Sequence, residues 1–518
     1  MIETVRLIEE TGALGRYQRD ESSAFAGRST RALVPTDVAG VCEVLRSARQ
    51  SREPVTVRAA GTSITGAPVP TCGGWVLATE RIRDLESLPD PTAVIGSAEA
   101  TLIRGPDYSF SLLEDERLAV VPPGLRLFEL SASLERYGLT YPPDPTELSA
   151  MIGGTIATNA SGARSYHYGA TRDWVEGLLI VFFNGRFRWI RKGDYVAEGH
   201  TLPLPPEAGI PSIELPRDYP AIETKNAAGL CLRKGMDLVD LFVGSEGILG
   251  IVAGALLSLE DRPKRLLQTA AFFPTEDGAF SFADLLREKE DVLSIEYFDA
   301  SSLGFMREHY PDLPTGPHSC VLFEVEPPDS AGGNPYPPPE YLETWTKRLR
   351  TAGSSENWSV SAEDVAAMKE FRHSLPEGIN RWVSGRTGKL GTDLAVPGDK
   401  FPELRHAYDA VRASGLRTVL FGHLGQYHLH LNFLPATDQE LAEARRRYLG
   451  LARTAVSLGG TVSAEHGVGK KWLNDEEGTL RPYLYFMLGS EGLRAIGEVK
   501  RALDPEWLLN PDTMIPRG

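Results

Sequence analysis

The chain has 518 residues, of which 42% are hydrophobic and 24% charged, and its formal net charge is −16. This length exceeds what one hydrophobic core supports, so we expect two or three packed units of ordinary globular composition. The acidic balance argues against non-specific binding to nucleic acid, which requires a basic surface, and against docking on anionic lipid by charge alone.

The four cysteines, Cys42, Cys72, Cys231 and Cys320, are scattered and form no CxxC pair. This spacing argues against an iron–sulfur cluster and against a disulfide framework, so we expect reduced thiols in a cytoplasmic protein. The N-terminal stretch MIETVRLIEETG carries acidic residues where a signal or transit peptide would carry basic ones. The sequence contains no run of about 18 apolar residues, and no transmembrane helix is expected.

The first predicted elements alternate helix and strand from Pro35 onward. Thr36 and Asp37 form a capping signal for a helix that ends near residue 50, and the apolar residues that follow keep helical spacing. Residues 55–59 (VTVRA) have the pattern of a buried strand, which runs into the glycine-bearing loop AGTSITGAP. The stretch LFELSASLERYG predicts an amphipathic helix that ends at Gly138.

A β-hairpin is predicted at EGLLIVFF-NG-RFRWI, because Asn184-Gly185 suits a tight type I′ turn between two β-rich runs. The proline-rich stretch from Gly193 to Pro220 has poor periodicity, and we expect a surface excursion there. The segment LFVGSEGILGIVAGALLSLED then supplies a helix end, a glycine turn and a strand that closes a first domain near Arg262.

Strands and helices alternate anew from Lys264. Within this second unit, Ser330 to Glu340 (SAGGNPYPPPE) is expected to be an exposed loop. The tail from about Val456 is predicted to be mainly helical and to stop at LDPEWLLNP.

Two glycine-bearing segments predict contact with a cofactor. In AGTSITGA, small residues after a strand allow backbone N–H groups to crowd a phosphate, although the loop matches neither GxGxxG nor GxxxxGKS. In IGGTIATNASGARSYHYG, glycine and alanine are denser than a turn requires. Such density suits a backbone that a flat cofactor approaches closely, since larger side chains would collide with it.

Seven segments in sequence order carry a resemblance to a known family: RAAGTSITG, PPDP, IGGTIATNASGARSYHYG, LFVGSEGILGIV, GHLGQYHLHLNF, SAEHGVG and LDPEWLLNP. They cover roughly Pro35 to Pro511. The sequence is identified as a member of the FAD-linked 2-hydroxyacid dehydrogenase family, which holds D-lactate dehydrogenase, D-2-hydroxyglutarate dehydrogenase and a glycolate oxidase subunit.

The resemblance implies the α+β fold of the vanillyl-alcohol oxidase (PCMH-type) superfamily. In that fold, an FAD-binding domain of two subdomains is followed by a cap domain with an antiparallel sheet, and a C-terminal helical segment returns to the FAD domain. The implied divisions are an N-terminal arm at 1–34, the FAD-binding domain at 35–262, the cap or substrate domain at 263–455 and the C-terminal segment at 456–518.

The resemblance also assigns a set of residues to FAD. They are Gly61, Thr62, Ser63, Gly66, Pro143, Gly153, Gly154, Asn159, Ser161, Gly162, Ser165, Gly169, Gly247, Ile251 and Asn510. The first loop would hold the pyrophosphate, and the second would line the flavin and diphosphate. Gly247 and Ile251 would contact the adenine side, and Asn510 would close over the isoalloxazine. Relatives that bind FAD covalently often have a histidine in the first loop, where this chain has Thr62, so we expect dissociable FAD.

The segment GHLGQYHLHLNF concentrates imidazoles: the chain has ten histidines, and His423, His428 and His430 fall within eight positions here. Strand alternation places His428, His430 and Asn432 on one face. A bend near Gly425 would bring His423 to the same point. Taken alone, two histidines on a strand are more often structural than metal-binding.

The family pattern GHxGDGNLH matches His423 and His430, which in the family bind a divalent metal, and the Glu of its GEHG motif matches Glu465. Two imidazoles and one carboxylate with an open position suit a catalytic ion, with Zn²⁺ favoured and Mn²⁺ as the alternative. His466 matches the family's general base, and an unperturbed imidazole pKa near neutrality suits that task.

The chain departs from the family pattern at two places. Gln426-Tyr427-His428 replaces Asp-Gly-Asn, and Ala464 replaces Gly. The first departure leaves several roles open for His428: a further metal ligand, a group that orients another ligand, or a catalytic-site contact with substrate. It also leaves open a substrate other than lactate.

Two cations are implied on the substrate side. The segment KEFRHSLPEGINRW resembles the cap-domain segment whose arginine binds the substrate carboxylate, and the match is Arg372. A planar guanidinium suits this task because it holds a carboxylate by two hydrogen bonds. Lys389, in KLGTDLAVP, resembles a further cation of the substrate site. The alternative for both is ordinary charge on a solvated surface.

The resemblance therefore implies an FAD-dependent enzyme that oxidises a small D-2-hydroxy acid to the 2-oxo acid by hydride transfer to flavin N5. A separate acceptor would take the electrons: a quinone, an electron-transfer flavoprotein, a cytochrome or dioxygen. The expected location is the cytoplasm, with peripheral membrane contact only through that acceptor, and a homodimer is left open.

Two rival functions are carried forward. One is a flavoenzyme without net redox chemistry, of the alkylglycerone-phosphate synthase type, whose signature is a histidine triplet near the position of SAEHGVG. This chain has Glu465-His466 there, which favours the dehydrogenase. The other is a flavin-binding subunit that has lost activity.

Overall fold

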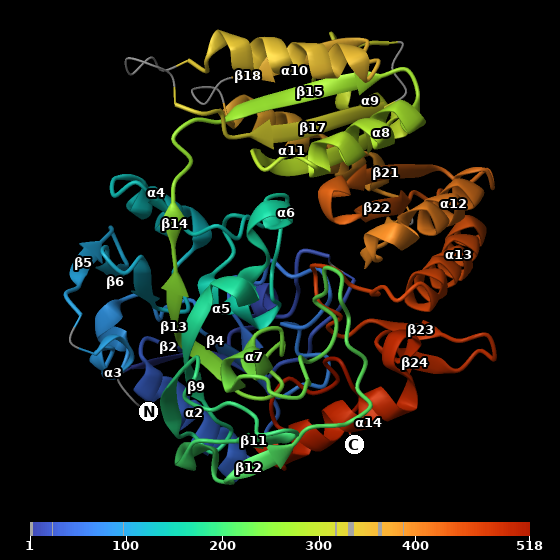
Figure 1. Cartoon of the computed structure of the whole chain (residues 1–518). Helices are drawn as coiled ribbons and strands as arrows, with labels where there is room; N and C mark the ends of the chain where they lie inside the picture. Colours follow the sequence, from blue (N-terminus) through green and yellow to red (C-terminus); the bar gives the residue numbers. More distant parts are fainter. Residues whose placement is uncertain are drawn as a thin grey trace.

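The computed structural model of the chain describes residues 4–22, 24–96, 98–315, 319–329, 336–360, 365–386 and 388–517. Its three largest sheets have four, six and eight strands. The first two sheets and their helices form the lower part of the molecule in Figure 1, and the eight-stranded sheet lies above them. We call these parts the FAD-binding half and the cap, following the divisions expected from the sequence.

The four-stranded sheet has the order β1-β2-β4-β3, in which β2, β4 and β3 are parallel and β1 is an antiparallel edge strand. Helix α2 (Val38–Ser51) connects β2 to β3, and the carboxylate of Asp37 accepts a hydrogen bond of 2.7 Å from the N–H of Gly40. The predicted helix and its cap are confirmed. The strands are β1 (Val5–Ile8), β2 (Arg31–Pro35), β3 (Val55–Arg58) and β4 (Trp75–Ala78), and the short helix α1 (Thr11–Leu14) follows β1.

The six-stranded sheet is antiparallel throughout, with the order β10-β9-β13-β7-β6-β5. A buried apolar cluster that includes Leu45 of α2, Leu77 and Val181 fills the space between this sheet and the first one. The strands are β5 (Thr101–Arg104), β6 (Ser109–Leu113), β7 (Leu118–Val121), β9 (Val175–Val181), β10 (Phe187–Arg191) and β13 (Ile251–Ser258). The helices in this part of the chain are α3 (Thr92–Ile95), α4 (Leu127–Glu135), α5 (Ile152–Ala157), α6 (Ser165–Tyr168) and α7 (Leu238–Phe242), of which α6 contacts β16 (Val292–Asp299) of the cap.

The predicted hairpin is present as β9 and β10, but its turn is not of type I′. A type I′ turn needs positive φ at both central residues, whereas Gly185 has φ 72° and Asn184 is not among the residues of positive φ. The N–H of Gly185 bonds to the carbonyl of Phe182, and the N–H of Phe182 bonds to the carbonyl of Arg186. This is the three-residue connection in which a left-handed glycine follows an ordinary turn.

The stretch from Gly193 to Pro220 is more ordered than its proline content predicts. It contains the antiparallel pair β11 (Thr201–Pro203) and β12 (Ser212–Glu214), whose Leu202 and Ile213 belong to the main buried core. The expectation of a surface excursion is therefore wrong for these strands, because their apolar side chains alternate into the core even though each strand is only three residues long.

The cap sheet has the order β18-β15-β17-β16-β21-β22-β19, with β20 also paired to β22, and every pair is antiparallel. Alternate residues of β15 enter different cores: Ala271 and Phe273 face the side of α8 and α10, whereas Ala270 and Phe272 face α9 and α11. The strands are β15 (Leu267–Phe273), β16 (Val292–Asp299), β17 (Ser319–Val325), β18 (Glu356–Val360), β19 (Leu390–Gly391), β20 (Leu394–Ala395), β21 (Thr418–Gly422) and β22 (His428–Phe433).

The helices of the cap region are α8 (Glu276–Arg287), α9 (Ala300–Met306), α10 (Pro339–Thr351), α11 (Val365–Val383), α12 (Phe401–Arg412) and α13 (Asp438–Ser457). Of the loop predicted from Ser330 to Glu340, residues 330–335 lie outside the described residues. Its last two residues begin α10. Among the described residues, none of the helices combines the length and the apolar character that crossing a membrane would take.

The C-terminal segment returns to the FAD-binding half. It contains α14 (Tyr485–Leu503), which is kinked at Gly489, and the small hairpin of β23 (Trp472–Asn474) and β24 (Leu480–Pro482). The N–H of Val55 donates to the carbonyl of Leu508, and the N–H of Asn510 donates to the carbonyl of Val55, so the last residues lie beside β3. A further two-stranded pair, β14 (Glu260–Asp261) with β8 (Leu139–Thr140), lies where the chain leaves for the cap.

A buried ion pair joins the two halves. Nε and Nη2 of Arg164, next to α6, lie 2.6 and 2.8 Å from the carboxylate oxygens of Glu324 on β17. Gln268 of β15 also donates to Glu324 at 2.8 Å. The side chain of Glu324 is 4% exposed, so its charge depends on these partners.

Replacing Arg164 by Met should lower the free energy of unfolding by about 3 to 5 kcal/mol, because it leaves the buried carboxylate of Glu324 without its counter-charge. The thermal unfolding midpoint measures the effect. The matched control is Arg188→Met, since Arg188 is 52% exposed and lies 3.7 Å from Glu207; its cost should stay below about 1 kcal/mol. Equal effects of the two substitutions would contradict the prediction.

Candidate active site

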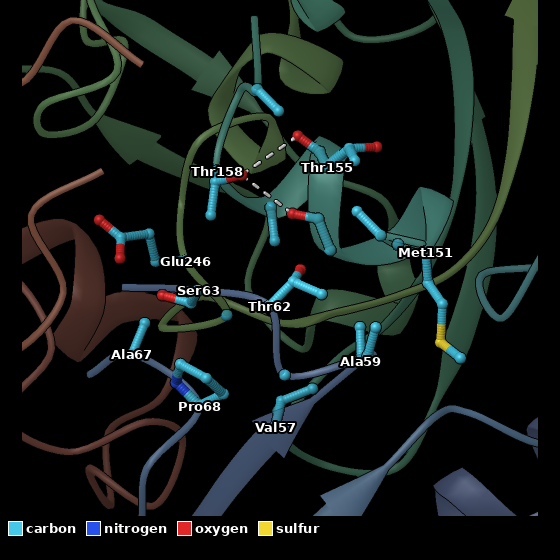
Figure 2. Close-up of a pocket in the computed structure, with 18 of the residues that line it drawn as sticks. Val57, Ala59, Thr62, Ser63, Ala67, Pro68, Met151, Thr155, Thr158 and Glu246 are labelled. Atoms are coloured by element: carbon cyan, nitrogen blue, oxygen red, sulfur yellow. Dashed lines mark hydrogen bonds between the residues drawn. The ribbon is translucent and has the colours of Figure 1, made fainter. Parts of the chain in front are cut away.

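A cavity of about 300 Å³ lies in the FAD-binding half. Its walls come from the loop after β3, from the segment that contains α5, and from residues 245–252. Glu465 and His466 complete one side, and Asn510 of the C-terminal segment also lines it. Figure 2 shows Thr62 and Ser63 of the first loop on one side of this space, with Thr155 and Thr158 on the other.

Most residues assigned to FAD by resemblance lie in this wall. Those that line the cavity are Gly61, Thr62, Ser63, Gly153, Gly154, Ser161, Gly247, Ile251 and Asn510. A Cβ added to Gly154 would lie 3.1 Å from the Cβ of Ala59, and one added to Gly247, whose φ is +75°, would lie 2.8 Å from the side chain of Asn510. Glycine at these two positions therefore lets the segments that form the wall approach one another closely.

The other assigned residues, Gly66, Pro143, Asn159, Gly162, Ser165 and Gly169, are not part of the cavity wall. The contacts of several show why. Oδ1 of Asn159 accepts a hydrogen bond of 2.9 Å from the N–H of Arg172, and Oγ of Ser165 accepts one of 2.9 Å from the N–H of Gly162. The N–H of Gly66 donates to Asp20. These residues shape the loops that carry the wall.

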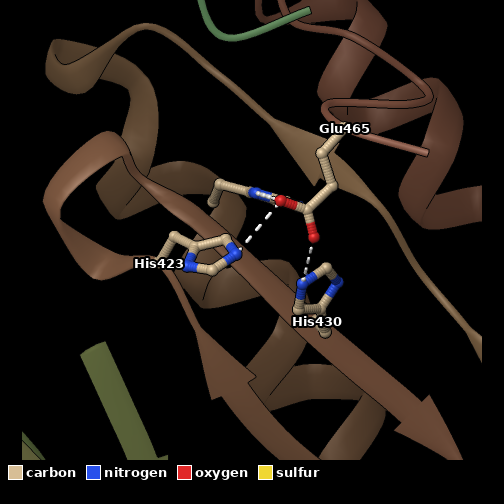
Figure 3. A group of neighbouring side chains, drawn as sticks. His423, His430 and Glu465 are labelled. Carbon is tan, nitrogen blue, oxygen red and sulfur yellow. Dashed lines mark ion pairs between the residues drawn. The ribbon is translucent and has the colours of Figure 1, made fainter. Parts of the chain in front are cut away.

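The three predicted metal ligands converge (Figure 3), and one of them, Glu465, also lines the cavity. His423 follows β21, His430 lies within β22, and Glu465 comes from the loop after α13. The Nε2 atoms of His423 and His430 lie 3.1 and 3.2 Å from Oε2 and Oε1 of Glu465. Burial alone raises the pKa of Glu465, but Lys225 and the two histidines outweigh burial and hold the pKa well below its usual range.

Each of these histidines has a partner on its other nitrogen. Nδ1 of His423 lies 2.6 Å from Oε1 of Glu296, and Nδ1 of His430 lies 3.1 Å from the carbonyl oxygen of Thr392. With Nδ1 as the donor in these bonds, Nε2 of each ring would offer its lone pair to an ion shared with Glu465, as is usual for metal-binding histidines. Two oriented imidazoles and one carboxylate therefore fit Zn²⁺ or another borderline divalent ion.

His428 joins the same group of side chains, as strand alternation predicts. It is 0% exposed, and its ring centroid lies 4.5 Å from that of His430. Nε2 lies 2.8 Å from Oδ1 of Asp393, and Nδ1 lies 4.0 Å from Oε2 of Glu465. Burial, with help from Lys225 and His430, lowers the pKa of His428 to about 3, so the imidazole is neutral.

His466 is held by Asp393, which directly precedes β20. Nδ1 of His466 lies 3.0 Å from Oδ2 of Asp393, and the same oxygen accepts the hydroxyl of Ser463 at 2.6 Å and the N–H of His466 at 3.0 Å. Burial lowers the pKa of His466, but Asp393 and Glu465 outweigh burial and raise it. The ring lines the cavity, and its other nitrogen, Nε2, lies 3.3 Å from Oε1 of Glu465. Because Asp393 engages Nδ1 and raises the pKa, Nε2 is the candidate proton acceptor.

The structure separates the two predicted substrate cations. Arg372 donates to Oγ1 of Thr146, a cavity residue, at 2.9 Å, and its Nε lies 3.9 Å from Oε2 of Glu296. Lys389 instead donates to Oδ1 of Asn380 at 3.0 Å and is not part of the cavity wall. The substrate contact of Lys389 stays a prediction without support from this geometry.

Sequence reasoning missed three charged residues of the site: Lys225, Glu296 and Asp393. Nζ of Lys225 donates to Oε2 of Glu465 at 3.0 Å, and its side chain is 3% exposed. Asp393 carried a signal that could have been used, because it is an acidic residue in the otherwise apolar stretch TDLAVP. The sequence around Lys225 and Glu296 carried no such signal, because the local pattern of polar and apolar residues is ordinary in both segments.

Glu246 holds the loop that carries Glu465 and His466. Its carboxylate accepts the N–H of Val468 at 2.9 Å and that of Gly469 at 3.0 and 3.2 Å. The backbone of Glu246 has φ 48°. Its N–H donates to the carbonyl of Ala157, and its carbonyl accepts a hydrogen bond from the side-chain amide of Asn510. The loop is thereby tied to the wall of the cavity.

Two family models match the chain. The model described as "FAD binding domain" matches residues 30–191, and that described as "FAD linked oxidases, C-terminal domain" matches residues 262–514. The two ranges together cover most of the sequence. The chain belongs to the FAD-linked oxidase family. The family recognised from the seven sequence motifs is thereby confirmed, and FAD is its cofactor.

Curated relatives of this FAD-linked oxidase span nearly its whole length. Glycolate oxidase subunit GlcD of Bacillus subtilis is 26% identical, over 97% of this chain and 92% of its own. D-lactate dehydrogenase of Archaeoglobus fulgidus is 25% identical (99% and 98% covered), and D-2-hydroxyglutarate dehydrogenase of Stutzerimonas stutzeri is 24% identical (99% and 96% covered).

Two solved structures of alkyldihydroxyacetonephosphate synthase resemble this oxidase, with TM-scores of 0.62 and 0.59 and sequence identities of 15% and 14%. Each match covers 99% of this chain and 82% of the other. At this identity the likeness concerns the fold alone, and together with the match to the FAD-binding family model it confirms the expected α+β fold.

The stability of the protein should depend on the ionisation of Glu246. Burial raises its pKa to about 7 from 4.5, although the N–H groups of Val468 and Gly469 lower it. A carboxyl whose pKa is higher in the folded than in the unfolded chain stabilises the fold at low pH. That contribution is lost as the pH rises from about 4.5 through about 7, and it amounts to about 3 kcal/mol at about 1.4 kcal/mol per pH unit.

The measurement compares the unfolding midpoint of the wild type with that of Glu246→Gln between about pH 5 and pH 8. The wild type should lose stability relative to the variant as the pH rises. The same comparison with Glu116→Gln, an exposed carboxylate between β6 and β7, should give no trend with pH. An unfolding midpoint of the wild type that rises relative to that of the Glu246 variant with increasing pH would contradict the prediction.

Proposed function

We propose that this chain is an FAD-dependent dehydrogenase that oxidises a small D-2-hydroxy acid, of the lactate, glycolate or 2-hydroxyglutarate type, to the 2-oxo acid. The observation that carries the proposal is that Glu465 and His466 line the same cavity as both glycine loops. A proton acceptor and a candidate metal ligand thus border the space that suits the cofactor. The names of the curated relatives support the same class of reaction.

The glycine loops would hold FAD without a covalent bond, since Thr62 stands where covalent relatives often have a histidine. Bound FAD supplies the two-electron acceptor, at flavin N5, for the hydride of the substrate α-carbon. His423, His430 and Glu465 would hold a divalent ion, Zn²⁺ or alternatively Mn²⁺. Such an ion supplies Lewis-acid polarisation of the α-hydroxyl group and lowers its pKa.

The side chains of this chain bind the acid and move its proton. Arg372 would bind the substrate carboxylate, because its guanidinium lies beside the cavity residue Thr146 and offers a planar pair of donors. His466 takes the hydroxyl proton at Nε2, because Nδ1 is engaged by Asp393. Loss of this proton and of the α-hydride converts the alcohol to a carbonyl group, so the product is the 2-oxo acid.

The two electrons then leave on a separate acceptor, for which a quinone, an electron-transfer flavoprotein and a cytochrome are the candidates. We place the enzyme in the cytoplasm, with any membrane contact made through that acceptor. The non-redox alternative of the alkylglycerone-phosphate synthase type is less favoured, because Glu465-His466 stands where that class has its histidine triplet. Similarity to solved structures of that class concerns the fold alone.

Replacing His466 by Asn should leave FAD bound and slow the reduction of FAD by substrate at least about 100-fold, because the hydroxyl proton loses its acceptor. The measurement is anaerobic bleaching of the flavin in a single turnover. D-lactate, glycolate and D-2-hydroxyglutarate are compared with L-lactate. His406→Asn, on the exposed face of α12, is the control.

A near-normal bleach in the His466 variant would remove that residue from the mechanism. A wild type that no 2-hydroxy acid bleaches would instead argue against the dehydrogenase and leave the two rival functions.

The purified protein should contain about one divalent transition-metal ion per chain, and His423→Ala and His430→Ala should each lose it. Elemental analysis measures the ion, and treatment with a chelator should lower the rate of flavin reduction without releasing FAD. The His406→Asn variant should keep its ion. A wild type that carries no such ion and is insensitive to chelator would return both histidines to a structural role.

A further inference from the structure

His428 is the imidazole of GHLGQYHLHLNF to which the proposed ligand set gives no role. Its side chain is 0% exposed. Among the residues that the structure describes, neither of its ring nitrogens has a hydrogen-bond partner of normal geometry. A buried polar atom left unpaired destabilises the folded state. An aliphatic side chain at this core position would leave no polar atom unpaired and would give a more stable fold. The presence of two ring nitrogens here therefore requires an explanation.

The imidazole of His428 faces the proposed ligands. Nδ1 lies 4.0 Å from Oε2 of Glu465, and the ring centroid lies 5.4 Å from that of His423 and 4.5 Å from that of His430. Taking one ligand atom from each of these four residues, all of the atoms lie within 4.8 Å of one another. Ligand atoms of a tetrahedral zinc site, with bonds of about 2.1 Å, are about 3.4 Å apart, so shifts on the order of 1 Å close the set.

Asp393 explains which nitrogen of His428 faces the ligands. Nε2 lies 2.8 Å from Oδ1 of Asp393, and this oxygen also lacks a hydrogen-bond partner of normal geometry among the described residues. A small rotation of the ring lets Nε2–H donate to Oδ1, which leaves the lone pair of Nδ1 directed at Glu465. A histidine that donates one N–H to a carboxylate and offers the other nitrogen to an ion is the usual arrangement in metal sites.

We propose that His428 is a fourth protein ligand of the ion, through Nδ1, so that the site consists of His423, His428, His430 and Glu465. The inference rests on the proposed metal-assisted function and deepens it. An ion held by these four residues would have no open fourth position left by the protein, and it would supply the same Lewis-acid polarisation of the substrate hydroxyl. Asp393 then orients the fourth ligand with one oxygen and the base His466 with the other.

The experiment uses the full-length chain with FAD bound, with its metal replaced by Co²⁺. His428→Asn and His428→Gln are compared with the wild type and with His406→Asn. Competition with a chelator gives the Co²⁺ affinity, and absorption to the red of the flavin bands reports the coordination of Co²⁺. Loss of a ligand should weaken Co²⁺ binding at least about 100-fold and change this spectrum in both His428 variants, while His406→Asn stays at the wild-type values.

Variants of His428 that keep the wild-type Co²⁺ affinity and spectrum would overturn this inference and leave the three-ligand site standing. A wild type that binds neither Co²⁺ nor Zn²⁺ would overturn the inference together with the metal in the proposed function. If the variants do not fold, X-ray absorption at the zinc edge of the wild type decides. Scattering from three imidazoles supports the proposal, and scattering from two overturns it.

Discussion

Two buried carboxylates, one from each half of the molecule, hold the segment 463–469. Asp393, from the cap, accepts the backbone N–H groups of Glu465 and His466, and Glu246, from the FAD-binding half, accepts N–H groups at the other end of the segment. Burying a carboxylate is costly unless hydrogen bonds replace its water, and here backbone donors do so. Because the bonds come from opposite sides, the positions of Glu465 and His466 depend on how the cap sits on the FAD-binding half.

The charges around this segment are arranged for chemistry more than for stability. Glu296, Asp393 and Glu465 are all buried, and Arg372 and Lys225 lie beside two of them. Burial raises the pKa of Glu296, yet His423 and Arg372 outweigh burial and keep it below its usual value. Apolar side chains of similar volume would occupy such a space at lower cost, so a buried network of this kind is retained where its charges perform a task.

Local patterns were sufficient for the features that depend on neighbours in the chain. The cap of α2 at Asp37 and the shared face of His428 and His430 on β22 follow from helical and strand periodicity, and the structure shows both. The hairpin at Asn184 was predicted correctly, but the predicted type I′ turn was wrong, because one additional residue in the connection changes which residue takes the left-handed conformation. The motif positions of His423 and Glu465 came from family resemblance, and no spacing rule could have supplied them.

The remainder of the site depends on strand register, which local patterns do not contain. Tyr297 pairs with Gly422 in the antiparallel ladder of β16 and β21, so the preceding Glu296 comes opposite His423. Likewise Ala395 pairs with His428 where β20 meets β22, which brings Asp393 to His428. A slip of one residue in either ladder would turn these side chains to the other face of the sheet. The geometry at the centre of the site is therefore fixed by backbone hydrogen bonds between strands, which in the pair of β16 and β21 are more than a hundred residues apart in the chain. The apolar faces of the cap strands hold these ladders in register.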